Sequence, residues 1–346
     1  MNFAELTSQQ WLLYERHMLF STVNSDFTAY DYKVAGSQFW ALFGSANDAG
    51  ATEAQKRETA QRLHDVRMAS QPIKDVESTR IYLWKEGNIP ASTVYTENRD
   101  YEYADSPDFR PYMVEIPVPQ DVAVKGVVIL CSGGAFLFRN NFVEGGPVAE
   151  ELSKLGYHCF VVNYRLNPYT MQEGALDLAR AVRYVRSHAE EYDIDEKDIA
   201  VMGFSAGGIL CGELSLHYAG AVDGTTIDPG YVPDELDKIS ANASAVGMIY
   251  SFYGRLSVAS TDVEEFMVSD LPPAFFLYGT KDSFVNSFDA CANALRQAGV
   301  PVKSHVLQGW PHGFGAGDGK WILYFDKWLT GVFDHARNTS AQEADA

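Results

Sequence analysis

From about residue 78 onward, short apolar runs alternate with helix-like stretches, and this alternation limits the possible folds more than any other feature. The helix-like stretches lie near 142–155, 172–190, 206–218, 285–298 and 320–335, and the apolar runs are TRIYLW, RPYMVEI, GVVIL, YHCFVVNY, IAVMGF, VGMIYSF, AFFLYG and VKSHVL. Strands separated by helices form a mainly parallel sheet with helices on both faces. The first two runs have no helix between them, so we expect an antiparallel pair at one edge. The predicted class is α/β.

The first 77 residues form a separate region of different composition. Thr7 with Gln10, and Thr52 with Gln55, have the spacing of capping boxes, which predicts two helix starts. Aromatic residues crowd the segment 27–43 between them. Three roles are open for this helical extension: a lid, a packing element or a dimer surface, so a homodimer is allowed. Residues 78–335 would then be the catalytic domain and 336–346 a disordered polar tail.

Composition narrows the classes of partner. The chain has 46 acidic and 27 basic residues, a formal net charge of -19, which disfavours nucleic acid and anionic membrane surfaces. No signal-peptide pattern or apolar stretch of about 18 residues occurs, so a cytoplasmic location is expected. The four scattered cysteines have no CxxC spacing and are expected to be buried thiols. We expect no metal and no cofactor, and a small-molecule substrate.

Ser205 lies in Gly203-Phe204-Ser205-Ala206-Gly207, which fits the G-x-S-x-G pattern of a nucleophile elbow. An apolar run precedes it and a helical stretch follows it. The hydroxyl would therefore project at the carboxyl end of the sheet, beside a helix N-terminus. Because this short pattern also arises by chance, Ser205 is a nucleophile only if a base, an acid and an anion site accompany it.

His312 is the candidate base among eight histidines. It lies in the loop GWPHGFG after the run VKSHVL, where a side chain can hang over the sheet edge. His158 and His305 fall within strand runs, and His188 and His217 within helices, where a structural role is more common.

Asp282, in AFFLYGTKDSFV, follows a strand run and falls between Ser205 and His312. The chain order Ser, Asp, His is that of the hydrolases with this elbow. Asp289 is a rival, but it falls inside the following helical stretch. A helix cap remains the structural alternative for Asp282.

The segment VVILCSGGAF supplies a glycine-rich turn after an early strand run. Such a turn can present backbone N–H groups to a developing oxyanion. We expect the amides of Gly133, Gly134 and Ala206 to form this oxyanion hole, with a shift by one residue to Ala135 left open.

With these residues placed, residues 78 to 335 resemble the α/β-hydrolase family, in particular its bacterial acetyl-esterase branch with hormone-sensitive-lipase-like and acetyl-xylan or feruloyl-esterase-like members. The motifs that carry the resemblance are CSGGAF, VVNYRL, DIAVMGFSAGG, LYGTKDSFV and PHGFG. The resemblance implies Ser205 as nucleophile, His312 as base and Asp282 as its orienting acid. The usual His-Gly-Gly-Gly turn is here Ser132-Gly133-Gly134-Ala135.

The expected activity is that of a serine carboxylesterase acting on short-chain acyl esters, acetyl esters above all and those of carbohydrates among them. Activity should fall toward acid pH, because a protonated imidazole cannot accept the serine proton. Bulky side chains beside the motifs would narrow the substrate pocket or belong to the core: Phe136, Phe204, Phe284 and Trp310. A serine peptidase of the same fold and a non-catalytic binding protein are the alternatives.

Overall fold

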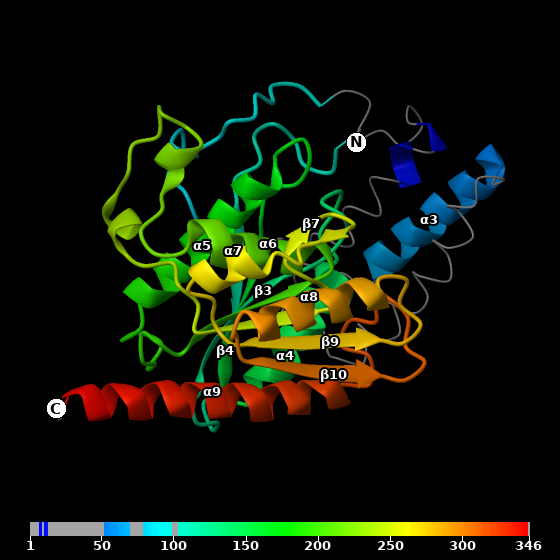
Figure 1. The fold of residues 1–346 in the computed structure, drawn as a ribbon. Helices are drawn as coiled ribbons and strands as arrows, with labels where there is room; N and C mark the ends of the chain where they lie inside the picture. Colours follow the sequence, from blue (N-terminus) through cyan, green and yellow to red (C-terminus); the bar gives the residue numbers. More distant parts are fainter. Residues whose placement is uncertain (1–6, 9, 13–51, 70–78, 99–102, 345–346) are drawn as a thin grey trace.

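The computed structural model describes residues 7–8, 10–12, 52–69, 79–98 and 103–344, and its centre is an eight-stranded sheet (Figure 1). The strands are β1 (Arg80–Tyr82), β2 (Tyr112–Ile116), β3 (Gly126–Cys131), β4 (Tyr157–Asn163), β5 (Ile199–Phe204), β6 (Ala245–Ile249), β9 (Ala274–Gly279) and β10 (Val302–Leu307). Their spatial order is β1-β2-β4-β3-β5-β6-β9-β10. All neighbours from β4 to β10 pair in parallel, whereas β2 pairs antiparallel with both β1 and β4. The predicted α/β class and the antiparallel edge are confirmed.

Helices cover both faces of the sheet (Figure 1). They are α4 (Gly146–Ser153), α5 (Met171–Ser187), α6 (Ala206–Glu213), α7 (Val263–Val268), α8 (Val285–Gln297) and α9 (Lys320–Ala344). Helices α4 and α9 lie together on one face, and the others lie on the opposite face. A small antiparallel hairpin, β7 (Gly254–Arg255) with β8 (Val258–Ala259), lies outside the main sheet. The sequence analysis did not predict this hairpin.

The central strands are apolar along their whole length because both of their faces are covered. Every residue of β3, β5, β6 and β9 is buried. Phe275 of β9 packs against Phe325 of α9, with ring centroids 5.4 Å apart. Tyr278, on the other face of the same strand, packs against Phe288 of α8 at 5.1 Å. The sheet thus forms a rigid platform between two helix layers.

The parallel strands end at the same edge of the sheet, and the loops that leave this edge carry the candidate residues. Ser205 follows β5, Asp282 follows β9 and His312 follows β10. The expected oxyanion turn, 132–136, follows β3. Because β3, β5, β6, β9 and β10 are neighbours in space, these four segments converge.

Both predicted capping boxes are present in the N-terminal region. The backbone N–H of Gln10 donates to Thr7 Oγ1 at 3.2 Å, and the backbone N–H of Gln55 donates to Thr52 Oγ1 at 3.3 Å. In each box the threonine N–H donates back to the glutamine side chain. The second box opens α3 (Glu53–Ala69). The aromatic segment 27–43 lies outside the described residues, so the role of the extension stays a prediction.

The sequence predicts a disordered tail over 336–346, but residues 336–344 are helical, because α9 continues to Ala344. Arg337 holds this part of the helix to the domain, since its Nε donates to Asp198 Oδ2 at 2.8 Å and its Nη2 to the carbonyl of Lys125 at 3.0 Å. The polar composition of the tail therefore did not exclude a helix.

All four cysteines are buried free thiols, as the sequence predicts. No helix in the described ranges combines the length and apolar character needed to cross a bilayer.

Candidate active site

Ser205 sits in a strained turn between β5 and α6. Its φ of 49° and ψ of -120° lie outside the regions that residues with a side chain favour. The turn is possible because glycines stand two residues before and two residues after Ser205: a Cβ on Gly207 would lie 2.0 Å from the carbonyl oxygen of Cys131. The Ser205 amide donates to Ile249 of β6 at 3.0 Å, and Ser251 Oγ donates to the Ser205 carbonyl at 2.6 Å. The elbow is thus tied to the next strand.

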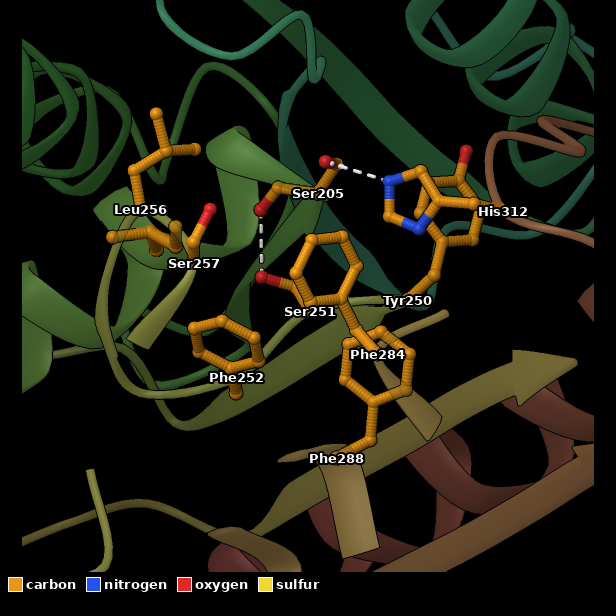
Figure 2. Close-up of a pocket in the computed structure, with 10 residues that line it drawn as sticks. Ser205, Tyr250, Ser251, Phe252, Leu256, Ser257, Phe284, Phe288 and His312 are labelled. Carbon is orange, nitrogen blue, oxygen red and sulfur yellow. Dashed lines mark hydrogen bonds between the residues drawn. The ribbon is translucent and has the colours of Figure 1, made fainter. Parts of the chain in front are cut away.

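The structure brings Ser205, His312 and Asp282 together in one chain of hydrogen bonds. His312 Nε2 lies 2.9 Å from Ser205 Oγ, and His312 Nδ1 lies 2.7 Å from Asp282 Oδ2 (Figure 2). Loops after three different strands supply the three side chains. This is the geometry of a nucleophile, a base and an orienting acid.

The Asp282 carboxylate and the His312 imidazole have different surroundings. The Asp282 side chain is fully buried, whereas 35% of the His312 side chain is exposed. Asp282 Oδ1 also accepts from the backbone amide of Phe284 at 2.9 Å. Because Phe284 itself is the N-cap of α8, the alternative of a helix cap does not hold for Asp282. Asp289, the rival acid, lies within α8 and accepts a hydrogen bond from Tyr278 instead.

Aromatic side chains fix the imidazole ring from two sides. The rings of Tyr250 and His312 meet edge to face, with centroids 4.9 Å apart. The ring of Phe284 lies 5.8 Å from that of His312. These contacts leave the ring edge that bears Nε2 directed at Ser205 (Figure 2).

The turn after β3 has an unusual backbone. Gly134, Ala135 and Phe136 all have positive φ, at 131°, 53° and 59°. Gly134 allows the closest approach, because a Cβ there would lie 2.0 Å from the carbonyl oxygen of Phe138. Successive backbone N–H groups in such a turn form a concave anion site.

One expected oxyanion donor needs correction. The Gly133 amide donates to Glu144 Oε2 at 2.6 Å, so its N–H is already engaged. The correction moves the candidate donors one residue along, to Gly134 and Ala135, with Ala206 at the start of α6. The sequence analysis missed the reason, because nothing in the segment NNFVEGG marks its glutamate as a partner of a turn 11 residues earlier.

Sequence reasoning overlooked two buried polar residues beside the site, Glu144 and Tyr250. Tyr250 Oη donates to Glu144 Oε1 at 2.8 Å, and both residues are buried. Burial raises the pKa of the Glu144 carboxyl above its ordinary value, while the hydrogen bonds from Gly133 and Tyr250 oppose this rise. Tyr250 lies inside the predicted strand run VGMIYSF, directly after the end of β6, and in that run it reads as one more apolar core residue.

A pocket opens beside Ser205 and His312, with about 260 Å³ of space that includes its solvent-facing mouth. The segment 250–252 that follows β6, helices α6 and α8 and the turn of the β7–β8 hairpin supply its walls (Figure 2). Apart from Ser205 and His312, the lining residues are Ile209, Tyr250, Ser251, Phe252, Leu256, Ser257, Phe284 and Phe288. The pocket is mostly apolar, as an acyl-binding site would be.

Of the four bulky residues expected at the pocket, only Phe284 lines it. Phe204 is fully buried and points into the core, where its ring packs near Tyr250 and Trp321. Phe136 is also buried, and Trp310 packs edge to face on Phe314, 5.1 Å between centroids. The alternative of a core position therefore holds for Phe136 and Phe204, and Trp310 lies outside this pocket, because nearness to a motif in the chain does not determine which face of a strand or loop a side chain occupies.

Comparisons with known proteins agree with this fold. A family model described as BD-FAE matches residues 114–263, and one described as alpha/beta hydrolase fold matches residues 238–316. Endo-1,4-beta-xylanase B of Butyrivibrio fibrisolvens is 27% identical over 81% of this chain and 44% of its own length. Acetylxylan esterase of Xylanibacter ruminicola is 27% identical over 66% of this chain and 48% of its own length.

A solved structure shares the architecture. The acetyl ester-xyloside bifunctional hydrolase from Caldicellulosiruptor lactoaceticus is 25% identical, with a TM-score of 0.53, over 71% of this chain and 98% of that chain. The sheet, the family-model matches and this solved structure show that the chain has the α/β-hydrolase fold. The chain spans about half the length of the two curated relatives that it matches here.

Proposed function

We propose that this protein is a serine carboxylesterase that hydrolyses short-chain acyl esters, acetyl esters in particular. The observation that carries the proposal is the hydrogen-bonded chain from Ser205 through His312 to Asp282. A serine hydroxyl alone is a weak nucleophile, and these hydrogen bonds place His312 as the base that activates it.

The reaction proceeds in two halves. His312 Nε2 accepts the proton of Ser205 Oγ while that oxygen attacks the acyl carbon, and the oxyanion receives hydrogen bonds from the amides of Gly134, Ala135 and Ala206. The imidazolium then protonates the departing alcohol, which leaves an acyl-enzyme. Water attacks this ester with His312 again as base, and the carboxylic acid and free Ser205 are released. Asp282 stabilises the imidazolium and holds its Nδ1–H.

The pocket beside Ser205 receives the acyl group in this proposal. Its aromatic and aliphatic walls exclude water, and its small volume favours acetyl and other short chains. The alcohol half is a carbohydrate, a proposal supported by the relatives named acetylxylan esterase and acetyl ester-xyloside bifunctional hydrolase. A cytoplasmic location and a homodimer remain predictions.

The proposal is tested with p-nitrophenyl esters of increasing acyl length, given to the wild type and to Ser205→Ala. We expect turnover to be highest for acetate and to fall by at least about 10⁴-fold in the variant, because the triad acts as a unit. Acetate release from acetylated xylo-oligosaccharides then tests the alcohol half. Wild-type cleavage of p-nitroanilides in preference to esters would favour a peptidase. Absence of both turnover and covalent labelling by a fluorophosphonate would favour a binding protein.

A further inference from the structure

Glu144 connects two parts of the site that are far apart in the chain. One carboxylate oxygen accepts a hydrogen bond from the Gly133 amide at 2.6 Å, and the other accepts one from the Tyr250 hydroxyl at 2.8 Å. The amide of Gly315, three residues beyond His312, donates to the same Tyr250 hydroxyl at 3.2 Å. A continuous chain of hydrogen bonds therefore runs from the turn after β3 to the loop that carries the imidazole.

We propose that Glu144 is a positioning residue of this esterase: it fixes the turn that presents the oxyanion amides against the loop that carries His312. The inference rests on the proposed function. Glu144 acts through Gly133 and Tyr250 and does not touch the reacting atoms.

The direct packing between the two segments supports this role. Glu144 belongs to a π-helical turn, Asn141–Gly145, which leads from the oxyanion turn into α4. The amide of Ala316 donates to the carbonyl of Val143 in this turn at 3.4 Å, and a Cβ on Gly315 would lie 2.3 Å from the same oxygen. The His312 loop thus rests on the backbone beside Glu144.

The backbone of Tyr250 also indicates that the link is functional. Its φ of 38° is uncommon for a residue with a large side chain, and the residue is buried. This conformation places the ring edge to face with His312 while the hydroxyl reaches Glu144. Strained residues of this kind cluster at functional sites.

A buried carboxylate has a specific advantage at this place. Burying it away from water is unfavourable unless hydrogen bonds compensate, and here its two oxygens accept from two donors on different segments. An apolar side chain of the same size would fill the space but would hold neither donor. A Gln side chain keeps one acceptor oxygen, and Tyr250 can rotate its hydroxyl to accept from the amide group.

The test compares Glu144→Ala, Glu144→Gln and Tyr250→Phe with the wild type on p-nitrophenyl acetate. We expect Glu144→Ala to lower kcat about 100-fold with KM within about 3-fold, because a misplaced oxyanion donor weakens only the transition state. Glu144→Gln should recover at least about 10-fold of this loss. Tyr250→Phe, which retains the ring, should lower kcat by about 10-fold.

Glu173→Gln is the matched control. Glu173 is also a buried glutamate that accepts backbone amides, from Ser92 and Thr93, both at 2.9 Å, but it lies at the start of α5. Its substitution should leave kcat unchanged. If Glu144→Ala does not fold, as judged by circular dichroism and thermal unfolding, Glu144→Gln and Tyr250→Phe decide the question by their kcat and KM values.

Two results would overturn the inference: a folded Glu144→Ala with kcat within about 3-fold of the wild type, or a Glu144→Gln that recovers nothing. Its failure differs from a failure of the proposed function. Wild-type turnover that disappears in Ser205→Ala upholds the esterase even if the Glu144 variants retain full kcat. A wild type without turnover removes both claims.

Discussion

At the scale of single residues, strained backbone conformations occur at and beside the candidate active site. Ser205, Tyr250 and Ala135 all have positive φ although none is glycine. Each lies in a segment that follows a strand of the sheet, and backbone hydrogen bonds to neighbouring strands hold Ser205 and Tyr250, through Ile249 of β6 and Leu277 of β9. The sequence revealed Ser205 through its small neighbours, but nothing in the residue types marked Ala135 and Tyr250.

The strain at Ser205 predicts a stability effect that is separate from activity. Ser205→Gly and Ser205→Ala should both be inactive, because both lack the hydroxyl. Ser205→Gly should have a free energy of unfolding about 1 kcal/mol higher than Ser205→Ala, since glycine adopts positive φ without a steric penalty. Urea unfolding of the two variants measures this difference. Equal stabilities would show that the elbow is not strained.

At the scale of secondary-structure elements, the small β7–β8 hairpin shapes the pocket. Leu256 and Ser257 lie in its turn and line the pocket wall, opposite Phe284 of the segment that leads into α8. Sequence periodicity did not reveal the hairpin because each of its strands has only two residues.

The hairpin predicts how acyl-chain preference can be changed. Leu256→Ala should widen the pocket and raise the ratio of kcat/KM for p-nitrophenyl hexanoate over acetate by about 10-fold, since a methylene group in an apolar pocket contributes about 1–3 kcal/mol. Val258→Ala, on the same hairpin but outside the pocket lining, is the control. An unchanged ratio in Leu256→Ala, or an equal change in Val258→Ala, would count against an acyl site here.

At the scale of the whole molecule, buried charged groups tie segments outside the sheet to the helix layers. Glu173 joins the start of α5 to the segment 92–93. Burial alone would raise the pKa of its carboxyl, but donors from Thr170 and Thr93 and the charge of Arg165 outweigh it, so the pKa lies below the ordinary value of 4.5.

This lowered pKa predicts how stability depends on pH. A carboxyl with a lower pKa in the folded state stabilises the protein above the pKa of its unfolded state, and this contribution is lost as the pH falls through the folded pKa. Glu173→Gln removes the titration, so its loss of stability relative to the wild type should be largest near pH 7 and smaller below about pH 4. Urea unfolding between pH 3 and pH 7 measures this, with the exposed Glu196→Gln as control. A stability difference that does not vary with pH would contradict the prediction.

The amino-acid sequence by itself determined the α/β class, the eight strands of the main sheet and the three residues Ser205, Asp282 and His312. It could do so because apolar periodicity reports burial, and because residues at the ends of neighbouring parallel strands meet whatever their distance along the chain. Only the tertiary structure decided which side chains line the pocket, that Gly133 gives its amide to Glu144, and that the last helix continues to Ala344. Those features depend on contacts between segments that are unrelated in local pattern, and local pattern is all that a single sequence shows.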